Sequence, residues 1–255
     1  MMQAIILCGG QGTRLRSVIG EKQKTMTKVG AVPFLVNVVN YLKSYKITNV
    51  IFATGYKSHE VRDYFGEKYY FGIDVSYSEE KTPLGTGGAI RNALPYIKYD
   101  YVLVLNGDTL FKANLKNLEK AFLSSNADMS IICKEVDDRS RYGSIRLDFN
   151  NEKVKGNNND FGIITSFDEK KSDSDKKEEE LYINGGIYIL KKKLIEEIPS
   201  GEKLSLEKDL IPRWISENKT ITGVISDESF IDIGTPESLE EYKDRVNNEG
   251  EEIEK

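Results

Sequence analysis

The chain alternates between short apolar runs and stretches in which apolar residues recur every three or four positions. In the first half, the apolar runs predict buried strands at QAIILC (3–8), NVIFATG (49–55), DVSYS (74–78), YVLVLN (101–106) and MSIIC (129–133). The stretches between them predict helices over 34–46, 58–66, 86–94 and 114–125. Because strands and helices alternate, we expect an α/β fold with a mostly parallel sheet and helices on both faces.

The second half has a different pattern. GSIRLDF (143–149), GIITSF (162–167) and LYINGGIYIL (181–190) follow one another without a long helix, which predicts a smaller antiparallel extension. Helices over 205–217 and 236–247 then bracket the strand-like runs TITGV and SFIDIG. The charged segment KKSDSDKKEEE (170–180) is expected to be an exposed loop, and 248–255 a flexible tail.

Charge is distributed unevenly along the chain. The formal net charge is −5, which argues against general nucleic-acid binding. Residues 14–28 nevertheless hold five cations and one acid, a local charge of five minus one, or +4. A concentrated basic loop in an acidic protein favours a small polyanionic ligand.

The remaining composition indicates a cytoplasmic protein. No apolar run approaches the roughly 18 residues of a membrane span, and MMQAIIL lacks the basic leader of a signal peptide, so we expect no membrane partner. Cys8 and Cys133 lie in apolar runs and are predicted to be buried, reduced thiols. The pattern leaves open whether the chain forms a homo-oligomer.

A glycine-rich loop follows the first predicted strand in the segment AIILCGGQGTRLRS. Glycines at this place usually bind phosphate. A Walker loop is excluded because no Gly-Lys followed by Ser or Thr is present. A dinucleotide loop is disfavoured because Leu15 stands where the third glycine belongs, and because basic residues follow where an acid would bind ribose.

The segment GGQGTRL with Lys24 downstream resembles the signature of the sugar-1-phosphate nucleotidyltransferases. The resemblance covers nearly the whole chain, through PLGTGGAI (83–90), LNGDT (105–109), RYGSI (141–145), SFDEK (166–170), YINGGIYIL (182–190) and FIDIGTPESLEEY (230–242). It implies a Rossmann-like nucleotide-diphospho-sugar transferase fold in a single domain, 1–255. In that domain, about 1–110 would bind nucleotide and about 111–247 would bind sugar phosphate.

The same resemblance implies a reaction. A sugar 1-phosphate would attack the α-phosphorus of a nucleoside triphosphate, and pyrophosphate would leave. Two polyanions must then meet, so catalysis is mainly electrostatic. The residues implied to be catalytic are Arg14, Lys24, Asp108 and Asp232, with Asp108 and Asp232 holding Mg²⁺. Taken alone, an aspartate after a strand is more often a turn or helix cap.

The matching motifs also imply binding residues. Those expected to contact the nucleotide are Leu7, Gly9, Gly10, Gly12, Thr13, Glu80, Gly85, Thr86 and Gly88. Those expected to contact the sugar phosphate are Tyr142, Gly143, Glu169, Lys170, Asn184 and Gly185. A carboxylate at Glu80 suits the paired donors of guanine, which favours GTP, although a surface role for Glu80 stays open.

Within the family, the chain is most similar to D-glycero-α-D-manno-heptose 1-phosphate guanylyltransferases. Mannose-1-phosphate guanylyltransferases and amino-sugar uridylyltransferases remain alternatives, as does a non-catalytic nucleotide-sugar-binding regulatory protein. A metal-dependent glycosyltransferase would not need the GGQGTRL loop. The chain departs from the family pattern at Gln23 and Thr25, where P-K-P is usual, and at Val32. Without the prolines, we expect a less rigid turn around Lys24.

Overall fold

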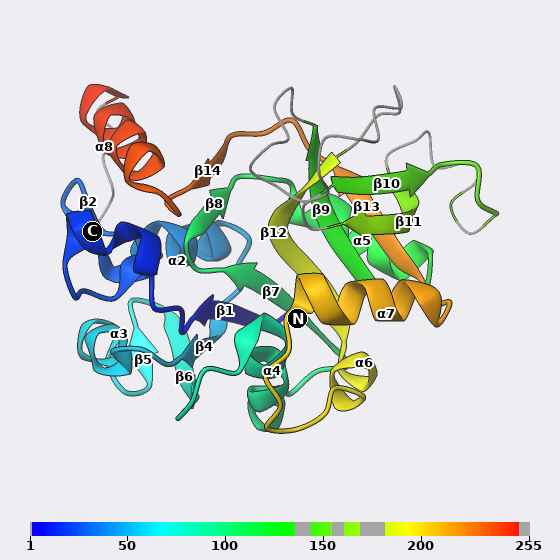
Figure 1. Ribbon diagram of the computed structural model, residues 1–255, viewed down its shortest axis with the longest axis horizontal. Coiled ribbons are helices and arrows are strands. Elements are labelled where there is room, and N and C mark those ends of the chain that lie inside the picture. Colours follow the sequence, from blue (N-terminus) through cyan, green and yellow to red (C-terminus); the bar gives the residue numbers. More distant parts are fainter. Residues whose placement is uncertain (1, 136–143, 153, 155–160, 169–181, 250–255) are drawn as a thin grey trace.

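A ten-stranded sheet runs through the computed structural model, which describes residues 2–135, 144–152, 154, 161–168 and 182–249. The strand order is β10-β11-β13-β9-β12-β7-β1-β4-β6-β5. Two shorter pairings, β14 with β8 and β2 with β3, lie outside this sheet. Figure 1 shows the sheet crossing the whole molecule, with helices in front of it and behind it.

The centre of the sheet is parallel, as the sequence predicted. It consists of β1 (Ala4–Cys8), β4 (Asn49–Thr54), β6 (Ile73–Glu79) and β7 (Tyr101–Asn106). In this register Leu7 pairs with Ala53 on one side and Asn106 on the other. The carboxyl ends of β1, β4 and β7 therefore meet at one edge, where α/β sheets commonly bind ligands.

The rest of the sheet combines parallel and antiparallel pairings, so the sheet as a whole is mixed and its purely parallel part is limited to the centre. Strand β12 runs antiparallel to both β7 and β9, and β13 returns parallel to β9. The strands outside the parallel centre thus continue the same sheet and do not form a separate extension. They are β5 (Tyr69–Tyr70), β9 (Met129–Glu135), β10 (Ser144–Asp148), β11 (Phe161–Asp168), β12 (Tyr182–Lys191) and β13 (Ile221–Ile225).

Two hydrophobic cores cover the two faces of the sheet. Along β1, Ala4, Ile6 and Cys8 join one core, whereas Ile5 joins the other, because successive side chains of a strand alternate in direction. The first core is covered by α2 (Phe34–Ser44), α3 (Ser58–Phe65), α5 (Leu115–Ser124) and α8 (Pro236–Glu249). The second is covered by α4 (Gly85–Asn92), α6 (Lys192–Glu196) and α7 (Ile211–Ser216).

Short elements connect these layers. The helical ones are α1 (Arg16–Ile19), three 3₁₀ turns at Thr13–Leu15, Lys24–Met26 and Leu94–Tyr96, and a π turn at Leu206–Leu210. The extended ones are β2 (Lys28–Val29), β3 (Val32–Pro33), β8 (Thr109–Phe111) and β14 (Phe230–Asp232). Among the described residues, no helix is long and apolar enough to cross a membrane.

Most predicted helices begin and end within two residues of the observed ones. The helix expected over 205–217 is instead the π turn Leu206–Leu210 followed by α7, with Pro212 in the first turn of α7. Helix α8 extends to Glu249, so it takes in the start of the expected tail. The charged segment 170–180 and residues 250–255 lie outside the described residues.

The two cysteines are free and buried, as the sequence predicted. Burial raises the pKa of the Cys8 thiol, and the nearby Glu80 carboxylate raises it further. Burial alone raises the pKa of the Cys133 thiol. Both groups therefore stay protonated and poorly nucleophilic at neutral pH.

We expect a thiol reagent such as Ellman's reagent to leave both Cys8 and Cys133 unlabelled in the native protein, because neither is accessible as a thiolate. Both should react stoichiometrically once denaturant has unfolded the chain. The absorbance of the released thionitrobenzoate gives the number of thiols that react in the native and in the unfolded protein. Rapid labelling of either cysteine under native conditions would contradict the burial described above.

Candidate active site

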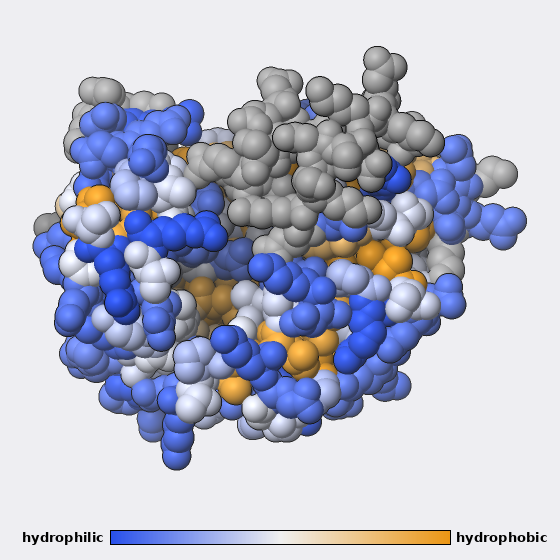
Figure 2. All heavy atoms as spheres, viewed as in Figure 1, coloured by the Kyte–Doolittle hydropathy of each residue, from blue (hydrophilic) through white to orange (hydrophobic). Residues whose placement is uncertain are grey.

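Two adjoining cavities open at the edge where β1, β4 and β7 end. Their volumes are about 650 Å³ and about 500 Å³. Both are lined by Lys24, Thr86, Asn106 and Asp108, so these four residues form their common boundary. Figure 2 shows the surface hollowed between the part that contains α3 and the part that contains α4 and α7.

The larger cavity gathers most of the residues predicted to bind nucleotide. Besides the common boundary, its lining includes the predicted residues Leu7, Gly9, Gly10, Glu80 and Gly85. Among the lining residues that the sequence analysis did not name as binding residues are Gly55, Tyr56 and Lys203. Gly55 directly follows β4. Its place at the carboxyl end of a parallel strand could have indicated a ligand-binding residue.

Glu80 lies half-buried in the larger cavity. Its Oε2 accepts a hydrogen bond from the Leu84 amide at 3.0 Å. A Cβ atom added at Gly9 or Gly55 would lie 2.9 or 2.7 Å from its Oε1, so both glycines make room for the carboxylate. Burial raises the pKa of Glu80, and the hydrogen bond from Leu84 partly offsets this effect.

The smaller cavity gathers the predicted residues Gly12, Thr13, Arg14, Asn184 and Asp232. Arg14 is exposed at this cavity. Glu207, which the sequence analysis missed, also lines it. No periodicity distinguishes Glu207 from the solvent-facing acids of a helix, so the sequence held no signal for it.

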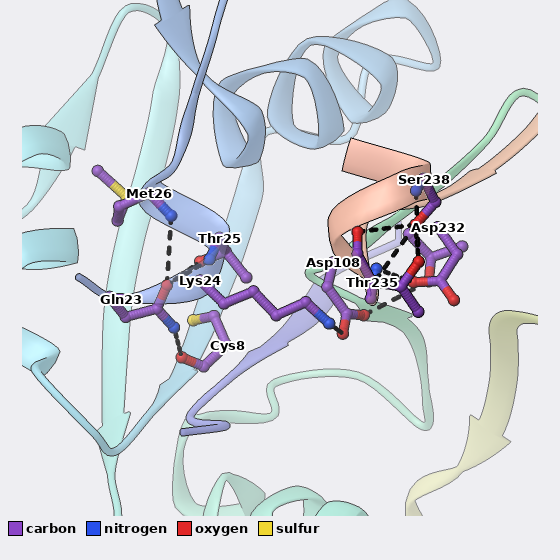
Figure 3. Close-up of polar contacts among 11 residues, drawn as sticks. Cys8, Gln23, Lys24, Thr25, Met26, Asp108, Asp232, Thr235 and Ser238 are labelled. Atoms are coloured by element: carbon purple, nitrogen blue, oxygen red, sulfur yellow. Dashed lines mark hydrogen bonds and ion pairs between the residues drawn. The ribbon is translucent and has the colours of Figure 1, made fainter. Parts of the chain in front are cut away.

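Asp108 and Asp232 are brought together by a short antiparallel pairing. Asp108 follows β7, and Asp232 ends β14, where it pairs with Thr109 of β8. The Ile233 amide donates to the main-chain oxygen of Asp108 at 3.0 Å, and the Gly234 amide donates to Asp232 Oδ1 at 2.7 Å. Figure 3 shows both carboxylates in the same region, with Lys24 extending toward Asp108.

The donor set at these two aspartates is suited to Mg²⁺. Within the described ranges, no group of three or more His, Cys, Asp or Glu residues could hold a metal by itself. Mg²⁺ often takes only one or two carboxylates and completes its shell with water and substrate phosphates. Asp108 and Asp232 therefore fit a cation that would bind together with a phosphate substrate.

Lys24 reaches the common boundary of the cavities from the 3₁₀ turn. Its Nζ lies 2.5 Å from Asp108 Oδ2, and its side chain is only 14% exposed. The stem of the side chain passes over Gly12, which has a φ of 57°. A Cβ atom at Gly12 would lie 2.9 Å from Lys24 Cβ, so both the conformation and the close approach require glycine.

The turn that carries Lys24 is held by the buried side chain of Gln23. Its Oε1 accepts from the Thr25 and Met26 amides at 2.5 and 3.2 Å, and its Nε2 donates to the Cys8 carbonyl. Figure 3 shows these contacts. They argue against the loss of rigidity expected from the missing prolines.

A chain of hydrogen bonds crosses from the larger cavity to β12. Glu207 accepts from Thr86 Oγ1 at 2.7 Å and from the Tyr188 hydroxyl at 3.1 Å. Tyr188 in turn accepts from Asn184 Nδ2 at 2.6 Å. Thr86 was predicted to bind the nucleotide and Asn184 to bind the sugar. The carboxylate of Glu207 and the hydroxyl of Tyr188 thus connect these two residues.

The remaining predicted residues lie elsewhere. Gly88 packs against the Glu202 carbonyl and Gly185 against the Phe111 ring, and neither is among the lining residues of the two cavities. Close packing explains why both lack side chains. Tyr142, Gly143, Glu169 and Lys170 lie outside the described residues.

Known proteins resemble this chain along almost its whole length. A guanylyltransferase for D-glycero-alpha-D-manno-heptose 1-phosphate from Aneurinibacillus thermoaerophilus is 39% identical over 92% of this chain and 94% of its own. Its counterpart from Campylobacter jejuni is 38% identical over 97% and 100%.

A crystal structure of HddC from Yersinia pseudotuberculosis, complexed with GMP-PN, has a TM-score of 0.79 and 32% identity, covering 96% of this chain and 100% of its own. The Nucleotidyl transferase family model matches residues 3–249. This chain therefore belongs to the nucleotidyl transferase family and is a sugar-1-phosphate nucleotidyltransferase.

Proposed function

We propose that this enzyme transfers a guanylyl group from GTP to D-glycero-α-D-manno-heptose 1-phosphate, giving a GDP-sugar and pyrophosphate. The observation that carries the proposal is the meeting of two cavities at Lys24 and Asp108. The larger cavity would take the nucleoside, and the smaller cavity would take the sugar phosphate, with the reacting groups at the common boundary. The outer phosphates of the nucleotide would extend past that boundary to Gly12, Thr13 and Arg14. The names of the two bacterial relatives support the choice of heptose.

The reaction needs electrostatic stabilisation more than proton transfer. The attacking phosphate oxygen is already ionised at neutral pH, so no general base is required. Lys24 would place its charge where the two phosphates meet, and Arg14 would offer a planar donor fork to the departing pyrophosphate. Main-chain amides of the loop from Gly9 to Thr13 would donate to the triphosphate.

Asp108 and Asp232 would hold Mg²⁺ in this proposal. When bound, the ion supplies positive charge to the phosphate oxygens of both substrates. Asp108 directly precedes β8, and Asp232 ends β14, which pairs with β8, so one ion could be shared between them. Because Asp108 already pairs with Lys24, its carboxylate would orient the lysine as well as bind the ion.

The proposal divides the chain into two functional parts within one domain. Residues of about 1–110 would bind the nucleotide, and those of about 111–247 the sugar phosphate. Asn184 would contribute its amide to the sugar. Tyr142, Gly143, Glu169 and Lys170 stay predictions for the same role.

Glu80 is proposed to select the base. Guanine presents N1–H and N2–H₂ as neighbouring donors, and a carboxylate can accept from both. Uracil and thymine lack this pair of donors. The half-buried position of Glu80 in the larger cavity supports such a role, because a hydrogen bond to a charged group is stronger away from water.

The substrate proposal is tested by measuring pyrophosphate release from four nucleoside triphosphates, each with heptose, mannose, glucose and N-acetylamino-sugar 1-phosphates. We expect GTP with D-glycero-α-D-manno-heptose 1-phosphate to give the highest kcat/KM. Preference for mannose 1-phosphate with GTP would keep the base assignment and reject the sugar. Preference for UTP would reject the guanylyl assignment.

The roles of Lys24 and Asp108 predict severe losses on substitution. Lys24→Ala and Asp108→Asn should each lower kcat by at least about a hundredfold, since removing one preorganised electrostatic contact typically costs a few kcal/mol in the transition state. Lys43→Ala and Asp63→Asn change exposed residues of α2 and α3 and should keep wild-type kcat. Wild-type turnover in Lys24→Ala and Asp108→Asn would reject the proposed chemistry.

The raised pKa of Glu80 predicts how GTP binding depends on pH. Protonation removes the charged acceptor, so the KM for GTP should rise as the pH falls through this pKa, which lies above that of an ordinary glutamate. Glu80→Gln should raise the KM about 5- to 150-fold, as for loss of a bidentate base contact of about 1–3 kcal/mol, and should remove this pH dependence.

Glu79→Gln is the matched control for Glu80→Gln, because Glu79 is the exposed neighbour on β6. Its KM for GTP and its pH profile should match those of the wild type. If Glu80→Gln behaves in the same way, Glu80 has only a surface role and the base must be read by the main chain.

A further inference from the structure

The side chain of Gln23 is fully buried beside the proposed reacting groups. Its amide uses both ends: Nε2 donates to the Cys8 carbonyl, and Oε1 accepts from the Thr25 amide, the Thr25 hydroxyl and the Met26 amide. It caps the 3₁₀ turn Lys24–Met26 in this way. One side chain therefore joins the turn of Lys24 to the last residue of β1, immediately before the glycine loop.

These contacts replace what a proline would supply. Gln23 has a φ of −65°, the value that a proline ring enforces. Unlike proline it keeps its own amide N–H, which donates to Glu60 Oε2 at 3.0 Å. Thr25 also keeps a main-chain N–H in a buried position, and Gln23 Oε1 satisfies that donor.

The position of Lys24 depends on this turn. A lysine side chain has several rotatable bonds, so holding its ammonium 2.5 Å from Asp108 Oδ2 requires a fixed starting point. The contact of its Cβ with Gly12 fixes one side of the stem. The hydrogen bonds of Gln23 fix the main chain on either side of it.

We propose that Gln23 is a positioning residue for Lys24: its buried amide fixes the 3₁₀ turn against the end of β1 and thereby sets the ammonium between the two cavities. This inference rests on the proposed role of Lys24 in nucleotidyl transfer. The two departures from P-K-P are also linked in this inference. Thr25 keeps a main-chain N–H that proline would lack, and Gln23 Oε1 accepts a hydrogen bond from it. Gln23 itself touches no reacting atom in this assignment.

A second buried glutamine provides a matched control. Gln3 is 1% exposed, and its side chain donates to the Tyr96 carbonyl and accepts from the Lys98 amide, both at 3.0 Å. It stands at the opposite end of β1, just before Ala4, and is absent from the lining of both cavities. Gln3→Met and Gln23→Met therefore remove buried hydrogen bonds at opposite ends of one strand, two at Gln3 and four at Gln23, and only Gln23 also lines the larger cavity.

The experiment compares kcat, KM and the midpoint of thermal unfolding for Gln3→Met and Gln23→Met. Both substitutions should lower the Tm. Gln23→Met should lower kcat about ten- to a hundredfold, as expected when a catalytic group is displaced by about 1 Å. Gln3→Met should keep kcat within about twofold of the wild type. Assays run well below both midpoints, so that unfolding does not contribute.

Gln23→Glu is measured in parallel, in case Gln23→Met does not fold. It keeps an acceptor for the Thr25 and Met26 amides but loses the donor to the Cys8 carbonyl, so kcat should fall less than in Gln23→Met. Wild-type kcat in the folded Gln23 variants, with a loss in Lys24→Ala, would overturn the positioning role alone. Equal losses of kcat in Gln3→Met and Gln23→Met would also overturn it. Wild-type kcat in Lys24→Ala would overturn both proposals.

Discussion

The position of β1 between two parallel neighbours is the constraint on which the site depends. Strands β4 and β7 end beside it, so the glycine loop, Gly55 and the Asn106–Gly107–Asp108 segment meet at one edge. Both faces of β1 are buried, which fixes its register against both neighbours. A shift by one residue would turn Ile5 toward the wrong core and misplace the loop that follows Cys8.

This arrangement addresses an electrostatic difficulty. Two phosphate-bearing substrates repel each other, and bringing them together requires positive charge in the right place before they arrive. Lys24 at the common boundary of the cavities is suited to this purpose, and its pairing with Asp108 keeps its charge compensated in the absence of substrates.

The sequence predicted the parallel half of the sheet well because β1, β4 and β7 are continuous apolar runs bounded by turn residues. It could not predict that β12 lies between β7 and β9, since antiparallel partners far apart in the chain are chosen by packing. Motifs pointed to the glycine loop and Asp108, and carboxylate chemistry pointed to Glu80; all of them line the two cavities. Gln23 was misjudged because the loss of prolines is visible in the sequence, whereas a buried amide that compensates for them is not.

Glu207 shows how the two cavities are connected. Burial and the charge of Glu207 raise the pKa of Tyr188 well above its ordinary value, so the phenol keeps its proton and donates it to the carboxylate. Tyr188 must then accept from Asn184 Nδ2, while Asn184 Oδ1 accepts from the Gly186 amide at 3.0 Å.

The amide of Asn184 is therefore fixed in orientation. Tyr188 uses one hydrogen of Asn184 Nδ2, and an amide nitrogen has two, so in the proposed function the second N–H would donate to a hydroxyl or phosphate oxygen in the smaller cavity. Thr86, at the start of α4, donates to the same carboxylate that holds Tyr188. Three consecutive hydrogen bonds thus join Thr86 to Asn184, and they would connect the proposed nucleotide and sugar sites.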